Sequence, residues 1–229
     1  MSAFIPLTRP PYDSDADALH RVRTFQETMS TRRSVRFFSD KPVPHEIIEW
    51  AILTAGSAPS GAHKQPWTFV AVSDPALKAR IREAAEAEER AFYAGRAGQA
   101  WLDDLKAFGT DAEKPFLEIA PWLIVVFQHN YQIDPDTGDR LKTYYVHESV
   151  GLATGLLLAA LHQAGLSTLT HTPSPMKFLA DVLERPENER AVMIVVAGHA
   201  TEDAVVPDIR RKTLDEIAIF KESAEERAG

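Results

Sequence analysis

The 229-residue sequence contains no cysteine. This absence excludes disulfide bonds, thiolate metal ligands and thiol nucleophiles together, and it is compatible with a reducing cytoplasm. Long apolar runs are also missing, because the longest, VGLATGLLLAALHQAG, holds only about twelve residues before His162, too few to cross a bilayer. The first thirty residues are interrupted by prolines and acids and lack the apolar core of a secretory signal. We therefore expect a cytoplasmic protein without a membrane partner.

An excess of basic charge is missing as well. The formal net charge is −8 at pH 7, whereas nucleic-acid phosphates are bound by basic surfaces, so we expect no nucleic-acid partner. The sequence has no G-x-S-x-G, no H-E-x-x-H and no phosphate-binding P-loop motif, and its eight histidines show no close pairing. These absences predict neither a metal site nor a serine nucleophile.

The apolar patterns that are present alternate between strand and helix periods. They predict strands at 67–72, 122–127, 166–172 and 191–199 and helices at 18–29, 45–54, 76–94, 144–164 and 176–183. The expected class is α/β or α+β, as one domain over 1–229 with an N-terminal arm (1–30) and a C-terminal arm (201–229). The helix segment 150–161 is apolar on every side, so it must be covered by its own fold or by a partner subunit.

Several polar groups are candidates for a binding site. Three guanidinium groups and a hydroxyl stand together at Arg32, Arg33, Ser34 and Arg36, in an expected turn before a helix. Arginine forks suit phosphate oxygens, so this cluster is either an anion site or an ordinary solvated turn. The segment 208–212, DIRRK, is by itself a solvated charge cluster.

The loop APSGAHKQPW (58–67) is a second candidate. Gly61 allows close approach of the backbone to a planar ligand, and exposed amide N–H groups there can hold an anionic oxygen. His63 is either a base or a loop residue without chemistry. Thr168, Thr170 and Thr172 alternate along a predicted strand and would place three hydroxyls on one side of it.

Glu89 and Tyr93 lie four residues apart in a predicted helix, on one face. Taken alone, this pair is typical of a helix surface. The segments RRSVRFF, APSGAHKQPWTFV, AEERAFY, LLLAALHQAGL, TLTHTP and VPDIRRK together resemble, in content and order, the flavin nitroreductase superfamily, and within it the iodotyrosine deiodinase branch. The resemblance extends from Arg32 to about Asp215.

The resemblance implies FMN bound between the subunits of a homodimer, on a nitroreductase-like α+β fold. That fold has a mostly antiparallel central sheet flanked by helices, with swapped terminal arms. The implied cofactor-binding residues are Arg32, Arg33, Ser34, Arg36, Pro59, Ser60, Gly61, Thr170, Thr172 and Arg211. Among them Arg36 matches the cation beside the pyrimidine end of the flavin. Thr170 matches the catalytic residue whose hydroxyl bonds the flavin N5 when substrate is bound.

The resemblance also assigns substrate contacts to Ala62, Glu89, Tyr93 and Lys114. Glu89 would accept from the ammonium of a halotyrosine, while Lys114 and Tyr93 would meet its carboxylate. Ala62 matches the position whose backbone N–H meets the phenolate. Lys114 lies in the polar loop FGTDAEKPF, which could fold over the site as a lid.

The implied activity is FMN-dependent reductive dehalogenation of halotyrosines to tyrosine, with loss of iodide, bromide or chloride. The electrons would come from an unidentified donor or an NAD(P)H-dependent reductase. A general NAD(P)H-dependent nitroreductase or quinone reductase is the main alternative. An enzyme that fragments reduced flavin and a flavin-binding sensor without turnover are the others.

Overall fold

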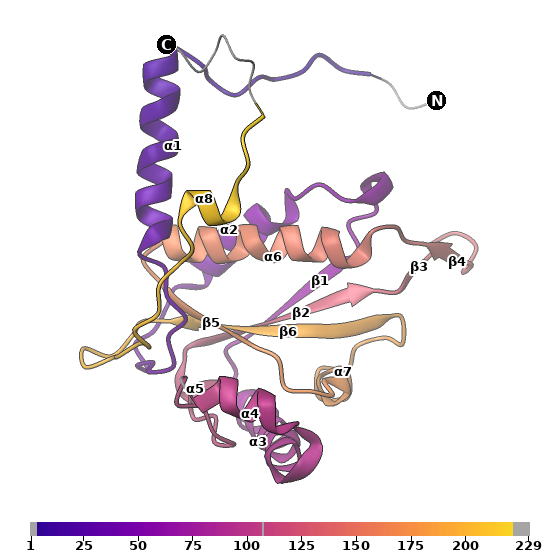
Figure 1. Ribbon diagram of the computed structural model, residues 1–229. Helices are drawn as coiled ribbons and strands as arrows, with labels where there is room; N and C mark the ends of the chain where they lie inside the picture. Colours follow the sequence, from indigo (N-terminus) through magenta and orange to yellow (C-terminus); the bar gives the residue numbers. More distant parts are fainter. Residues whose placement is uncertain (1–3, 107, 222–229) are drawn as a thin grey trace.

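The computed structural model describes residues 4–106 and 108–221 (Figure 1). Its centre is a four-stranded sheet in the order β1-β2-β6-β5, in which all neighbouring strands are antiparallel. The strands are β1 (Trp67–Val72), β2 (Trp122–His129), β5 (Ser167–His171) and β6 (Glu189–Gly198), and a separate hairpin pairs β3 (Tyr131–Ile133) with β4 (Arg140–Lys142). This arrangement confirms the predicted α+β class with an antiparallel central sheet.

Helices cover both faces of the sheet (Figure 1). The helices are α1 (Asp15–Ser30), α2 (His45–Gly56), α3 (Pro75–Ala91), α4 (Gln99–Lys106), α5 (Phe116–Ile119), α6 (Val146–Gln163), α7 (Lys177–Val182) and α8 (Leu214–Ile217), with a 3-10 turn η1 (Gly61–His63) and a π-helical turn η2 (Phe92–Arg96). Helices α2 and α6 lie on one side, and α3, α4, α5 and α7 lie on the other. In the part of the chain that the structure describes, no helix is long and apolar enough to span a bilayer.

Each face of the sheet has its own apolar core because strand side chains alternate between faces. On β6, Ile194 and Val196 belong to the core beside α3, α5 and α7, whereas Val195 and Ala197 belong to the core beside α2 and α6. Strand β2 is buried from Trp122 to Gln128. Its continuous apolar run predicted burial on both faces, and this prediction is confirmed.

Helix α3 begins where the sequence predicts and ends differently. Asp74 Oδ1 accepts the Leu77 backbone N–H at 2.7 Å, and Pro75 takes the first helical position, where no N–H is needed. The predicted end near residue 94 is wrong in detail, because the α-helix stops at Ala91 and continues as η2. Gly95 has φ 152°, a conformation open only to glycine, and it ends the turn. Tyr93 therefore belongs to a π-helical turn.

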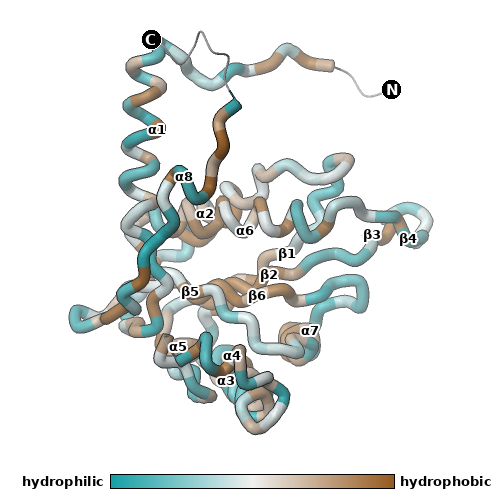
Figure 2. The backbone as a smooth tube through the Cα atoms, in the orientation of Figure 1, coloured by the Kyte–Doolittle hydropathy of each residue, from teal (hydrophilic) through white to brown (hydrophobic). Residues whose placement is uncertain are grey.

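The apolar helix α6 is covered on one side only by its own chain. Leu157 is fully buried, but Leu152 and Leu156 are 53% and 36% exposed. Beside them on α2, Trp50 and Leu53 are 64% and 61% exposed. Figure 2 shows both helices as largely apolar. Since the fold leaves this surface open, the expected cover on this side is a partner subunit.

Both terminal segments lie largely outside the packed body. Helix α1 rises away from the sheet (Figure 1) and has no buried residue. Its apolar side chains Leu19, Val22 and Phe25 are between 46% and 59% exposed. In the C-terminal segment Leu214 and Ile217 are exposed as well. The swapped arms and the single domain stay predictions, and residues 1–3 and 222–229 of the arms lie outside the described residues.

The arginine-rich segment after α1 is extended, so the predicted turn is wrong. Ser34 forms a parallel bridge with Thr168 of β5, and Phe38 forms an antiparallel bridge with Ala200 after β6. The Val35 N–H donates to the Thr168 carbonyl at 3.1 Å. These bonds attach the segment to the open edge of β5.

Candidate active site

The predicted phosphate-binding residues gather around one cavity. The cavity has a volume of about 200 Å³, and we call it the arginine pocket. It is lined by Arg32, Arg33, Ser34, Arg36, Phe108, Pro207, Ile209, Arg210 and Arg211. The arginine cluster is therefore not an isolated solvated turn, because residues more than 170 positions apart in the sequence line the same pocket.

Arg211 reaches this pocket from the C-terminal segment. Its guanidinium donates to the Ser30 carbonyl at 2.7 Å and to the Arg32 carbonyl. The Arg33 guanidinium donates to the Pro207 carbonyl on the same segment. Both contacts attach the C-terminal segment to the residues after α1. Five guanidinium groups without a carboxylate among the pocket residues form a site for a multiply charged anion.

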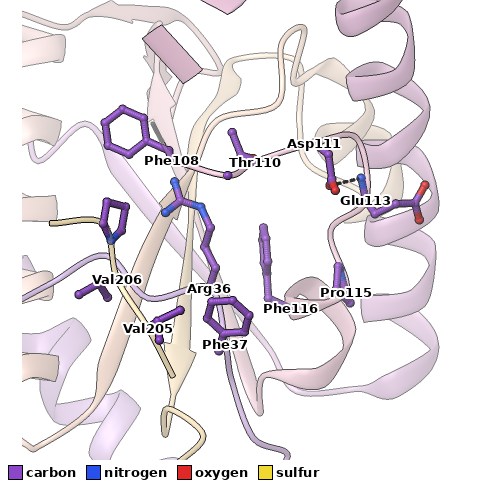
Figure 3. Close-up of a pocket in the computed structure, with 12 residues that line it drawn as sticks. Arg36, Phe37, Phe108, Thr110, Asp111, Glu113, Pro115, Phe116, Val205 and Val206 are labelled. Atoms are coloured by element: carbon purple, nitrogen blue, oxygen red, sulfur yellow. Dashed lines mark hydrogen bonds between the residues drawn. The ribbon is translucent and has the colours of Figure 1, made fainter. Parts of the chain in front are cut away.

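A larger cavity of about 490 Å³ adjoins the arginine pocket through Arg36, Phe108 and Pro207, which line both (Figure 3). Phe37, Phe108 and Phe116 give it aromatic walls. The Arg36 guanidinium carbon lies 5.9 Å from the centre of the Phe108 ring. Burial lowers the pKa of Arg36, but the ordinary pKa of arginine is so high that the guanidinium keeps its charge in proteins. This cavity therefore combines an apolar wall with a fixed cation.

Glu89, Tyr93 and Lys114 meet behind the wall of this cavity, next to its lining residue Thr110, and we call them the tail cluster. Lys114 Nζ lies 3.4 Å from Glu89 Oε2 and 5.8 Å from the centre of the Tyr93 ring. Tyr93 Oη donates at 3.2 Å to the carbonyl of Thr110, which lines the cavity. Only 3% of the Lys114 side chain and 14% of the Glu89 side chain are exposed.

Burial changes the titration of this cluster. It raises the pKa of Glu89, an effect that the Lys114 ammonium opposes. Burial also raises the pKa of Tyr93, so its phenol keeps its proton and stays a donor. A buried acid and a buried ammonium side by side, with a phenol at hand, form complementary partners for the two charges of a free amino acid.

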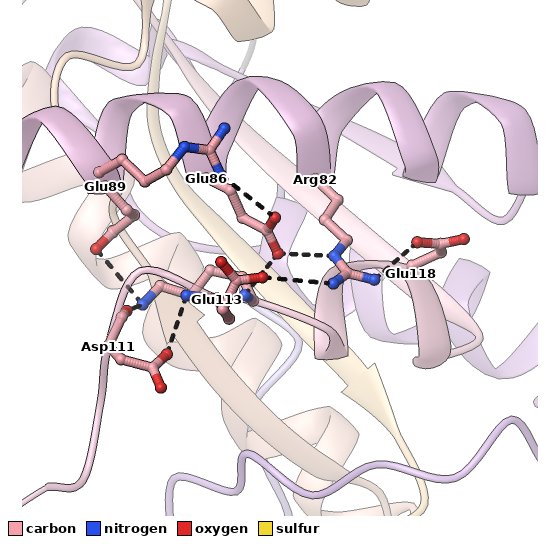
Figure 4. Close-up of polar contacts among 8 residues, drawn as sticks. Arg82, Glu86, Glu89, Asp111, Glu113 and Glu118 are labelled. Atoms are coloured by element: carbon pink, nitrogen blue, oxygen red, sulfur yellow. Dashed lines mark hydrogen bonds and ion pairs between the residues drawn. The ribbon is translucent and has the colours of Figure 1, made fainter.

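A second layer of charges holds Lys114 in place (Figure 4). Glu86 Oε1 accepts the Lys114 backbone N–H and the Arg82 Nε–H, each at 2.7 Å. Arg82 also donates to Glu118 of α5 at 3.0 Å. Burial acts to raise the pKa of Glu86, yet these hydrogen bonds outweigh it and lower the pKa overall. Sequence reasoning did not single out Glu86, although it lies one helical turn before Glu89.

His171 is the other residue that sequence reasoning missed. It ends β5, its side chain is 9% exposed, and its ring meets Phe116 edge to face with centroids 5.6 Å apart. His171 Nε2 lies 4.0 Å from Glu89 Oε1 and has no hydrogen-bond partner among the described residues. The alternation of β5 was the available signal, because it turns His171 away from its threonine neighbours and toward α3.

The loop Pro59–Ala62 lies apart from these groups within one chain. The Gly61 N–H contacts Ser149 Oγ near the start of α6, at 3.4 Å. Thr31, beside the arginine pocket, contacts His162 near the end of the same helix, at 3.0 Å. At 1.5 Å per residue these two points are roughly 20 Å apart along the axis.

Gly61 packs closely against the backbone of Tyr144, and its predicted place beside a ligand stays a prediction. A Cβ at this position would stand 2.7 Å from the Tyr144 carbonyl oxygen, so this close approach requires glycine. Ala62 and His63 both have positive φ, 51° and 55°, which is uncommon for residues with a Cβ. Their backbone is therefore held in a strained form, as is common at binding loops.

Thr170 is the fourth residue of β5, and Thr172 follows the end of that strand. Thr168 is buried under Ser34, whereas Thr170 is exposed. Thr172 lies one residue beyond the end of β5, so the prediction of three hydroxyls on one strand is wrong for Thr172. Thr170 is two residues along β5 from the bridge between Thr168 and Ser34 and one residue before His171.

The sequence of this chain is similar to proteins of known family. The family model described as the nitroreductase family matches residues 29–199. A protein named iodotyrosine deiodinase from Haliscomenobacter hydrossis is 56% identical over 210 residues, covering 92% of this chain and 94% of its own. The chain belongs to the nitroreductase family, in its iodotyrosine deiodinase branch. This confirms the resemblance seen in the sequence.

More distant members of the branch agree. Iodotyrosine deiodinase from Danio rerio is 46% identical over 214 residues, covering 92% of this chain and 72% of its own. The crystal structure of an oxidised iodotyrosine deiodinase bound to FMN and 3-iodo-L-tyrosine aligns with a TM-score of 0.72 at 30% identity. It covers 86% of this chain and 100% of its own. The branch is therefore supported by sequence and by fold.

Proposed function

We propose that this nitroreductase-family protein is an FMN-dependent reductive dehalogenase that converts halotyrosines to tyrosine. The observation that carries the proposal is the tail cluster of Glu89, Tyr93 and Lys114 beside a cavity that adjoins the arginine pocket. A general nitroreductase has no use for a buried acid, phenol and ammonium at this place. Relatives that share 43–56% identity carry the name iodotyrosine deiodinase, which supports the same activity.

The residues present fit FMN. Arg32, Arg33, Arg211 and the Ser34 hydroxyl would hold its phosphate, since the arginine pocket offers cations and no carboxylate. Arg36, in the larger cavity, would lie near the flavin ring. A fixed cation there favours negative charge on that ring. When bound, FMN in its reduced form supplies two electrons to the substrate.

The tail cluster would orient the substrate. The Lys114 ammonium pairs with the substrate carboxylate, Tyr93 donates to that carboxylate, and Glu89 accepts from the substrate ammonium. With its charged tail fixed, the halogenated ring is held over the flavin site in one orientation, which lowers the entropic cost of reaction. The Ala62 N–H would donate a hydrogen bond to the phenolate oxygen, and the Thr170 hydroxyl would donate to the flavin N5.

The reaction needs two electrons and one proton. The aryl carbon–halogen bond breaks, the halide leaves with the bonding pair, and a carbon–hydrogen bond takes its place. Holding the substrate oxygen as a phenolate at the Ala62 N–H raises electron density in the ring and aids protonation of its carbon. Iodide is the best leaving group of the three halides, so we expect iodotyrosines to react fastest.

We also propose a homodimer in which each FMN site is completed by the partner. The exposed face of α2 and α6 carries Trp50 and Leu156 in an apolar groove of about 560 Å³, a surface that single chains rarely leave open. If two α6 helices pack antiparallel about a two-fold axis, the Pro59–Ala62 loop of one chain comes beside the arginine pocket of the other. The exposed α1 then has a second chain to pack on.

The electron donor is proposed to be a separate reductant or an NAD(P)H-dependent reductase. The cytoplasmic location expected from the sequence stays a prediction.

An anaerobic single-turnover experiment tests the activity. Holoenzyme reduced with dithionite is mixed with 3,5-diiodotyrosine, and flavin reoxidation is followed together with released iodide. We expect one iodide for every flavin oxidised. No iodide with diiodotyrosine, combined with rapid reoxidation by nitroaromatics and turnover with NAD(P)H, would instead identify a general nitroreductase. Tight halotyrosine binding without iodide release would identify a sensor.

A further inference from the structure

His171 is a buried polar group that the mechanism above does not use. Its Nε2 is without a hydrogen-bond partner among the described residues and is directed at Glu89, 4.0 Å from Oε1. The edge-to-face contact with Phe116 and the β5 backbone pairing with Ile194 fix the ring. A buried polar atom without a partner costs free energy. This arrangement indicates that His171 acquires its partner in another state of the site.

Charge decides which form of the imidazole is present. The Lys114 ammonium and the Arg36 guanidinium both lie near His171, and among the described residues Glu89 is the only acid paired with it. Two cations and burial disfavour a third positive charge, so the ring is neutral. A neutral imidazole carries one N–H, and at Nε2 that N–H points at a carboxylate oxygen.

Glu89 stands between two donors. Its Oε2 faces Lys114 at 3.4 Å, and its Oε1 faces His171 at 4.0 Å. When a halotyrosine enters, the substrate carboxylate draws Lys114 away from Glu89, while the substrate ammonium needs Glu89 to be ionised. A shift of about 1 Å by Glu89 toward His171 brings Oε1 to hydrogen-bond distance. The neutral N–H of His171 then replaces part of the stabilisation that the Lys114 ammonium gave to the Glu89 carboxylate.

We propose that His171 is a positioning residue for amino-acid recognition, whose Nε2–H donates to Glu89 and holds that carboxylate aimed at the substrate ammonium. The inference rests on the proposed function, because it names how the same site selects an α-ammonium group. A neutral donor suits this role better than a second cation, since a cation would compete with the substrate ammonium for Glu89. It follows that His171 affects ligands with an ammonium and leaves ligands without one unchanged.

The test compares two ligands in three proteins. The ligands are 3-iodotyrosine and 3-(4-hydroxy-3-iodophenyl)propionate, which lacks only the ammonium. The proteins are the wild-type holoenzyme, His171→Leu, which removes the donor, and His171→Gln, whose amide N–H reaches about as far as Nε2. Dissociation constants come from quenching of flavin fluorescence. His129→Gln, at a half-buried histidine that ends β2, is the matched control.

We expect His171→Leu to bind iodotyrosine about tenfold more weakly, as for loss of one hydrogen bond to a charged group. His171→Gln and the control should bind it within about threefold of wild type, and the propionate should bind equally to all four. Equal weakening of both ligands would reduce His171 to a packing role and overturn the proposal. Unchanged iodotyrosine binding in His171→Leu would overturn it too.

Two further outcomes are decided by the same data. If His171→Leu does not fold, His171→Gln carries the test, and a Gln variant that no longer prefers iodotyrosine over the propionate contradicts the proposal. If the wild-type holoenzyme binds neither ligand, the proposed function itself fails. If the wild-type holoenzyme binds iodotyrosine and the substitutions at residue 171 leave that affinity unchanged, the inference alone fails.

Discussion

The tail cluster and the cofactor site differ in how much of each a single chain supplies. Glu89, Tyr93 and Lys114 come from one continuous stretch of the chain, and they already contact one another. The cofactor residues are divided between the two ends of α6, roughly 20 Å apart along the helix axis, with the arginine pocket at one end and the Pro59–Ala62 loop at the other.

This difference separates recognition from catalysis. On the proposed function, selectivity for an amino-acid tail would be built into each chain and held by the Glu86–Arg82 network, whereas the flavin site would need a second copy to be complete. Substitutions in the tail cluster should therefore spare FMN, and substitutions on the exposed α2–α6 face should lose it. The predictions below test that separation, beginning with the largest expected effect.

A charge placed on the exposed apolar face should abolish both the dimer and FMN binding. Leu156→Glu would bury a carboxylate against the partner chain, which costs several kcal/mol when it is unpaired. We expect a monomer without bound flavin, measured by sedimentation and by flavin absorbance after gel filtration. Ile133→Glu, at a similarly exposed apolar residue on β3, is the control and should remain a flavin-bound dimer. A flavin-bound monomer of Leu156→Glu would contradict the shared site.

Removing the ammonium of the tail cluster should weaken substrate binding and nothing else. Lys114→Ala leaves the substrate carboxylate and Glu89 without their cation, which we expect to weaken iodotyrosine binding roughly a hundredfold. The FMN content of Lys114→Ala should stay at the wild-type level. The control is Lys142→Ala, at an exposed lysine on β4, which should keep both its FMN content and its affinity for iodotyrosine. Fluorescence titration measures the affinity, and equal affinities in the two variants would remove the cluster from the account.

The buried His171 should make the folded protein sensitive to acid. Burial, with Lys114 and Arg36, lowers the pKa of His171 to about 3 from 6.5. Between these values the unfolded chain binds a proton that the folded chain does not, so stability falls as pH falls from 6.5 toward 3. Relative to His171→Gln, we expect wild type to lose on the order of 2 kcal/mol between pH 7 and pH 4. Urea unfolding at the two pH values measures this, and parallel losses would refute it.

The Thr170 hydroxyl should have the smallest effect, on rate and not on binding. Thr170→Ala removes one hydrogen bond to the flavin site, and we expect iodide release in a single turnover to slow about tenfold. Thr170→Ser keeps the hydroxyl and should recover most of the rate. FMN and iodotyrosine should bind both variants as tightly as wild type. A full rate in Thr170→Ala would exclude this role.

The sequence predicts elements well where local signals are strong. Strand β1 has the predicted bounds, and the Asp74 cap with Pro75 begins α3 as expected. The arginine cluster at 32–36 is expected to form a turn before a helix, yet pairing with β5 makes it extended. The π-helical turn at Tyr93 depends on Gly95 and on tertiary contacts, which no local pattern reveals.

For the candidate site, too, the sequence predicts some features and only the fold shows the others. Resemblance to the family names Lys114 and Glu89, but only the fold shows that they face each other. His171 escaped notice because it stands between two threonines in a strand, and its role depends on packing against Phe116 and α3. The close packing of Gly61 against Tyr144 is likewise visible only in the fold, and the place of Gly61 beside a ligand stays a prediction. The spacing of residues along the sequence does not reveal contacts between distant segments.

The most direct test of the central claim compares two ligands that share the halogenated phenol and differ in the tail. Binding of 3-iodotyrosine and of 2-iodophenol to the wild-type oxidised holoenzyme is measured by quenching of flavin fluorescence. A chain that grips the amino-acid tail should bind iodotyrosine at least about a hundredfold more tightly. Dissociation constants within about threefold of each other would mean that Glu89, Tyr93 and Lys114 do not recognise the tail, and they would contradict the account.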